Sequence, residues 1–98
     1  MATATSQVNP PVTPPATEDA LLQAIARDFD GLSRQLKLIA SHVERHRSHI
    51  GIQSVQDVAK TCGVQPSAVV RFAKHFGFDG FTALQRVFRD RLAQQLSP

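Results

Sequence analysis

Apolar residues recur at spacings of three and four along most of this chain, which is the period of an amphipathic α-helix. Glycines and helix-capping residues interrupt this pattern, and no segment alternates convincingly as a strand would. The pattern predicts five helices, at residues 17–29, 33–45, 54–62, 65–76 and 81–96. The sequence therefore predicts an all-α fold, a five-helix bundle.

The most distinctive local pattern lies in residues 54–76. Ser54 and Asp57 have the spacing of a capping box, in which each side chain would bond a free backbone amide at the helix start. Gly63 ends this helix, because glycine adopts the left-handed conformation at low cost. Pro66 suits the first position of the next helix, where its missing amide hydrogen costs nothing. This arrangement predicts a homeodomain-like helix-turn-helix.

The apolar residues are expected to face a common core. In the helix-turn-helix they are Val55, Val58, Ala59, Cys62, Val64, Val69, Phe72, Ala73 and Phe76. The first two helices contribute Leu21, Leu22, Ile25, Ala26, Phe29, Leu36, Ile39, Ala40 and Val43, and the last contributes Phe81, Leu84, Phe88, Leu92 and Leu96. Ile50 and Ile52 are expected to fold back from a loop at 46–53, and Phe78 to anchor a glycine turn. Leu38 falls outside these stripes.

The helix at 66–76 directs a mixed set of side chains outward. Arginine can read guanine in the major groove, glutamine can read adenine, and a methyl group can contact thymine. We therefore predict a DNA-binding surface made of Gln65, Pro66, Ser67, Val70, Arg71, Lys74 and His75. Arg71 is the best candidate for a base edge, because its planar fork can bond guanine bidentately. Lys74 and His75 are expected near phosphates.

Several of these residues have a second interpretation. Gln65 and Ser67 either meet DNA together with the free backbone amides of the helix start, or only cap the helix. Val70 is either a half-buried core residue or a thymine contact. Arg71 and Lys74 could form an ordinary solvated face. The alternative function for the whole chain is a helical interaction or dimerisation module without DNA readout, which would use Leu38 and the last helix.

The order of motifs resembles the N-terminal domain of RpiR-type transcriptional regulators over residues 20–95. The resemblance rests on Leu32-Ser33, Ser54-Val55, Ala59, Cys62-Gly63-Val64, Val69-Val70-Arg71-Phe72 and Phe76-Gly77-Phe78-Asp79-Gly80-Phe81. The chain departs from that family at Arg34 and Leu36, where a proline and a glutamate are common, and at Gln65, where a serine is common. The resemblance implies operator binding by a homodimer. A phosphosugar effector is expected only if a sensor domain exists outside this chain.

Composition adds a domain boundary and a partner class. Residues 1–16 hold four of the six prolines and carry no charged side chain. This composition predicts a disordered leader before a domain at 17–98. A net charge of +3 and a pI near 9.8 favour an anionic partner such as double-stranded DNA. Neither a signal sequence nor a membrane span is predicted, so we expect a cytoplasmic protein.

Residues with potential chemistry have simpler interpretations. His42, His46 and His49 have spacings that a continuous helix could use for a metal, but we expect solvated surface. Cys62 is expected to be a small buried hydrophobe. The chain has no paired carboxylates, no nucleophile with a base and no phosphate-binding glycine loop. The sequence therefore predicts no enzyme, no catalytic or metal residue and no cofactor.

Overall fold

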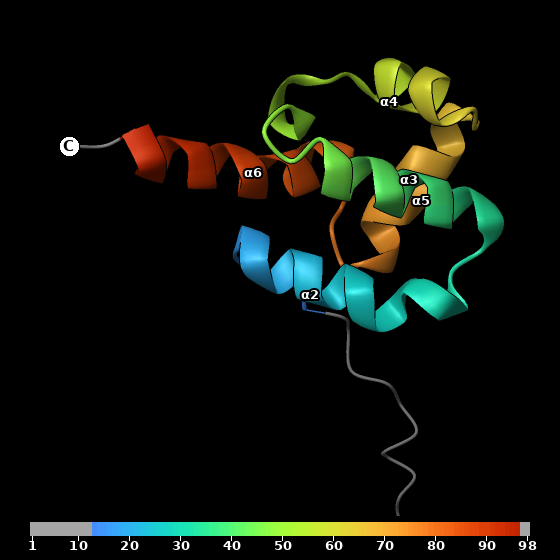
Figure 1. Ribbon diagram of the computed structural model, residues 1–98, viewed down its shortest axis with the longest axis horizontal. Helices are drawn as coiled ribbons and strands as arrows, with labels where there is room; N and C mark the ends of the chain where they lie inside the picture. Colours follow the sequence, from blue (N-terminus) through green and yellow to red (C-terminus); the bar gives the residue numbers. More distant parts are fainter. Residues whose placement is uncertain (1–12, 97–98) are drawn as a thin grey trace, which may run out of the picture.

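The structure, a computed structural model, describes residues 13–96. Five α-helices and two short 3-10 helices follow one another in that range, without a strand (Figure 1). They are α2 (Glu18–Asp28), η1 (Phe29–Gly31), α3 (Arg34–Arg45), η2 (Ile50–Ile52), α4 (Val55–Cys62), α5 (Pro66–His75) and α6 (Phe81–Leu96). The predicted all-α fold is confirmed. Residues 1–12 of the predicted leader lie outside the described residues.

Three helices begin at the capping residues that the sequence indicates. Thr17 Oγ1 accepts the amide of Ala20 at 3.1 Å, and Ser33 Oγ accepts that of Leu36 at 3.3 Å. Ser54 Oγ accepts the Asp57 amide at 3.0 Å. The reciprocal bond from the Ser54 amide to the Asp57 side chain is not formed among the described residues, so the predicted capping box is only half complete.

The helices enclose one hydrophobic core. Its largest fully buried side chains are Phe72, Leu21, Ile25, Ile39, Ile50, Leu84, Val43, Val58 and Val69. The Phe72 ring meets the Phe76 ring edge-on, with 5.1 Å between centroids. Helix α3 crosses the middle of the molecule, and α5 packs against α3, α4 and α6 (Figure 1). The inner side of α5 is therefore buried in this core.

Four residues predicted for the core are exposed instead. In α2, Ala24 is buried and Ala26 is exposed. Ile52 is 81% exposed, whereas its neighbour Ile50 is fully buried. Leu92 and Leu96 are 45% and 74% exposed, because α6 is about 24 Å long and its last turns extend beyond the core. Leu38 is exposed, as its position outside the stripe predicted.

Two buried polar side chains hold the segment between α3 and α4. Gln85 Nε2 donates to the carbonyl of Ile50 at 2.8 Å and also to that of Gln53. The His42 Nε2 atom lies 2.9 Å from Gln53 Oε1, and the His42 and His46 rings lie 4.6 Å apart. His42 is only 4% exposed, so the prediction of a solvated histidine was wrong there. It is buried because this irregular segment needs side-chain partners for its polar groups.

The turn between α4 and α5 forms as predicted. Gly63 has a φ of 72°, in the left-handed region, and its amide donates to the carbonyls of Ala59 and Lys60. The Val64 amide then donates a hydrogen bond of 2.9 Å to the Ala59 carbonyl. The α4 helix therefore stops at Cys62, and the chain reverses into α5.

Cys62 is expected to react slowly with alkylating reagents. The side chain is half-buried beside this turn, and burial raises the pKa of its thiol. Less thiolate is therefore present in the folded state at a given pH than in the unfolded state. Iodoacetamide labelling at pH 8, followed by mass spectrometry, should proceed faster after denaturation. Equal rates in both states would contradict this expectation.

Candidate nucleic-acid interface

The structure places the predicted DNA-binding residues along the outer side of α5 and at its start. Ser67, Arg71 and Lys74 are exposed, and Val70 beside them is half-buried. Gln65, Pro66 and His75 are also exposed, at the two ends of the helix. Residues three and four apart on a helix share a face, so Ser67, Val70, Arg71 and Lys74 form one stripe. We call these four residues, together with Gln65, Pro66 and His75, the α5 stripe.

The start of α5 presents free hydrogen-bond donors. Pro66 occupies the first turn, and the Gln65 carbonyl accepts the Ala68 amide at 2.9 Å. The Gln65 side chain makes no cap hydrogen bond. Neither the amide nor the hydroxyl of Ser67 has a hydrogen-bond partner among the described residues. These groups lie at the positive end of the helix dipole, where an anion is favoured.

Supplying a cap at Gln65 is expected to stabilise the domain. The variant Gln65→Ser places a short side-chain oxygen next to the free amides of α5, which should raise the free energy of unfolding by about 0.5–1 kcal/mol. Gln65→Ala removes the same side chain without adding an acceptor and serves as the control. Urea denaturation of both variants checks this prediction, and equal stabilities would contradict it.

Two side chains of the stripe contact helices that are distant in sequence. Arg71 Nη2 donates to Gln35 Oε1 of α3 at 3.1 Å. His75 Nε2 lies 3.3 Å from Asp28 Oδ2 at the end of α2, and Arg27 Nε donates to Asp28 Oδ1 at 3.1 Å. The hydrogen bond from Arg27 lowers the pKa of Asp28, with a smaller lowering from His75 against partial desolvation. Sequence reasoning missed Gln35 and Asp28, because neither belongs to a local pattern.

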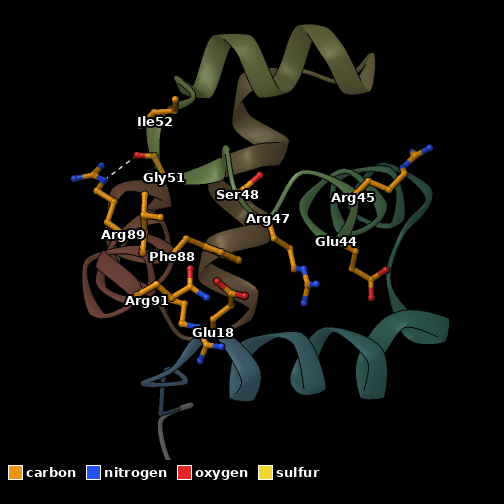
Figure 2. A pocket seen from close by; sticks show the side chains of 12 residues that line it. Glu18, Glu44, Arg45, Arg47, Ser48, Gly51, Ile52, Phe88, Arg89 and Arg91 are labelled. Carbon is orange, nitrogen blue, oxygen red and sulfur yellow. Dashed lines mark hydrogen bonds between the residues drawn. The ribbon is translucent and has the colours of Figure 1, made fainter. Parts of the chain in front are cut away.

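A separate cavity of about 360 Å³ lies at the other end of these helices (Figure 2). Glu18 and Arg47 line it from the start of α2 and from beyond the end of α3, whereas Asp28 and Gln35 mark the opposite ends of the same two helices. Figure 2 shows Arg47, Arg91, Glu18 and Glu44 around this hollow, with Phe88 beside it. Its mixed charge distinguishes it from the α5 stripe.

Two further properties concern the described residues only. They include no group of three or more His, Cys, Asp or Glu side chains that could hold a metal ion. None of their helices has both the length and the apolar character needed to cross a membrane.

Helices α4 and α5 are joined by a glycine in the left-handed conformation, and the inner side of α5 packs into the core. This arrangement defines a helix-turn-helix domain. The chain belongs to the rpiR family of such domains, because the family described as "Helix-turn-helix domain, rpiR family" matches residues 19–97. It is 32% identical over 74 residues to the "Uncharacterized HTH-type transcriptional regulator YfhH" of Escherichia coli (strain K12). That match covers 76% of this chain and 26% of the relative, so the chain spans about a quarter of the relative's length. No solved structure matches the chain.

Proposed function

We propose that this chain is the sequence-specific DNA-binding part of a transcription regulator, with α5 inserted into the major groove. The observation that carries the proposal is the α5 stripe, in which exposed cations and free donors lie on the outer side of a helix whose inner side is fully buried. Membership in a helix-turn-helix family and similarity to an HTH-type regulator support the same proposal.

Each residue of the stripe has a proposed role. Arg71 bonds the edge of a guanine, and Val70 contacts a thymine methyl group. Gln65 and Ser67 contact bases or phosphate at the start of α5, where Pro66 begins the helix. Lys74 neutralises a phosphate and His75 lies next to one, and phosphate contacts supply most of the affinity. His75 reaches a phosphate while its Nε2 atom stays 3.3 Å from Asp28 Oδ2.

The proposal extends to the assembly in which the domain works. Regulators of this kind bind as dimers to paired half-sites, so we propose a homodimer in the cytoplasm on double-stranded DNA. A phosphosugar effector is part of the proposal only if a sensor domain exists outside this chain. Binding of this kind requires no cofactor and no chemical step.

Selection of bound sequences from random duplex DNA tests the proposal. We expect one enriched motif, and two copies at a regular spacing if the protein binds as a dimer. Affinity for the enriched motif should fall steeply with salt, with a slope of about 0.9 per phosphate contact on a double-logarithmic plot. Recovery of unenriched sequences would contradict specific readout, and a flat salt dependence would contradict phosphate contacts.

A second candidate function is a protein-interaction module. The exposed apolar side chains of Leu38, Leu92 and Leu96 favour it, because such residues are suited to an interface. This function predicts that Leu92→Ser abolishes self-association or partner binding. It also predicts that neither the native chain nor the variant binds DNA. Enrichment of a DNA motif would rule it out as the sole function.

A further inference from the structure

The outer face of α5 has a neighbour that the helix-turn-helix itself does not contain. Gln35 lies in the first turn of α3, thirty-six residues before Arg71, and its Oε1 accepts a hydrogen bond from Arg71 Nη2 at 3.1 Å. Both side chains are exposed, so the contact lies on the surface of the domain and outside its hydrophobic core. It lies beside the stripe that the proposed function places against DNA.

Both residues of this contact belong to α-helices that pack against the core. Gln35 lies between Ser33, whose side chain caps α3, and Leu36, whose amide that cap binds. Arg71 precedes Phe72, which is fully buried in the core. The relative position of the two Cα atoms is therefore set by the packing of α3 against α5. A side-chain bond between two such points restrains the long arginine side chain.

The chemistry of Gln35 suits a role in positioning Arg71. An arginine that reads guanine must give up rotamer freedom when it binds, and a side chain ordered beforehand gives up less. The Gln35 oxygen uses one N–H of the guanidinium and leaves the other N–H groups available for guanine O6 and N7. Because Gln35 is neutral, it leaves the positive charge of Arg71 uncancelled.

We propose that Gln35 is a specificity-determining residue, which positions the Arg71 guanidinium to read one base pair. This inference rests on the proposed function, and it adds the first turn of α3 to the machinery of base selection. Gln35 acts through Arg71 and not by its own contact with DNA.

A double-mutant cycle of Gln35→Ala and Arg71→Ala tests this inference. Its affinities are measured on the selected motif and on duplexes that carry each single base-pair substitution in that motif. Gln35→Ala is expected to weaken binding to the best duplex by about three- to tenfold, because the Arg71 side chain must then lose its rotamer freedom on binding. Its base preference should fall at the same base pair at which Arg71→Ala loses preference. In the Arg71→Ala background, adding Gln35→Ala should change affinity by less than about twofold, because the two residues act as a unit.

Two further variants separate positioning from other roles. Gln35→Glu keeps an acceptor for Arg71, so the preference at that base pair should persist, although affinity should fall through repulsion of phosphates. Gln23→Ala removes an exposed glutamine from α2 and should alter neither affinity nor preference. Thermal unfolding should give the same midpoint for Gln35→Ala and Gln23→Ala.

The outcomes distinguish this inference from the function on which it rests. An unchanged base preference in Gln35→Ala, with Arg71→Ala impaired, would overturn the inference and leave the proposed function standing. Additive losses in the double variant would also overturn it, because they indicate direct contact between Gln35 and DNA. If neither the native chain nor any variant selects a DNA motif, the proposed function and the inference both fail.

Discussion

Replacing Gln85 with leucine is expected to lower the free energy of unfolding by about 2–4 kcal/mol. The Gln85 amide bonds the carbonyls of Ile50 and Gln53, and leucine leaves both without this donor. A buried carbonyl that loses its partner costs about 1–3 kcal/mol, and the Ile50 carbonyl keeps only the long 3.4 Å hydrogen bond from the Gln53 amide. The loss should loosen the segment that leads from α3 into α4. Chemical denaturation followed by far-UV circular dichroism measures it.

Gln94→Leu is the matched control for this variant. Gln94 lies on the same helix but is exposed, so the same chemical change there should alter stability by less than about 0.5 kcal/mol. Equal effects of the two variants would show that Gln85 does not hold the η2 segment. Hydrogen exchange gives a local readout, because the Gln53 amide, bonded to the Ile50 carbonyl, should lose protection first in Gln85→Leu.

Replacing Arg71 with alanine is expected to weaken binding to the selected DNA motif by about 1–3 kcal/mol and to relax preference at one base pair. The guanidinium is exposed on the outer face of α5, and the proposed function assigns it to a guanine edge. Lys74→Ala should instead weaken binding to all sequences alike and reduce the salt slope by about one unit. Fluorescence anisotropy with labelled duplexes at several salt concentrations distinguishes the two patterns.

Arg91→Ala is the matched control, because it removes the same charge from the cavity end of the molecule. We expect its DNA affinity to stay within about twofold of the native value, since surface charges farther away than a Debye length are screened at physiological salt. If Arg91→Ala were as impaired as Arg71→Ala, net charge and not the α5 stripe would account for binding. If Arg71→Ala and Lys74→Ala both bound normally, insertion of α5 into the groove would be wrong.

Much of the candidate interface could be predicted because its signals are local. The cap at Ser54, the left-handed Gly63 and Pro66 lie within a few residues of the turn that they build. Helical periodicity then determines which side chains of α5 face outward. The family resemblance, confirmed over residues 19–97, rested mostly on the same stretch and on the aromatic glycine turn after it, with Leu32-Ser33 in addition.

The errors share one physical cause, which is that periodicity shows a face but not whether another element covers it. Leu92 and Leu96 continue the apolar stripe of α6, yet both remain exposed to solvent. His42 has the polarity of a surface residue, but it is buried because Gln53 provides a partner for its ring. The local sequence around these residues contains no signal for either result.

The sequence by itself determined the helices, their caps, the helix-turn-helix and the outward position of Arg71 and Lys74. These features depend on backbone conformation and on spacing within one or two helical turns. Only the tertiary structure decided that Gln35 lies beside Arg71, Asp28 beside His75, and Gln85 beneath the segment before α4. Such contacts join residues more than thirty positions apart, and they follow from how the helices pack and not from any local pattern.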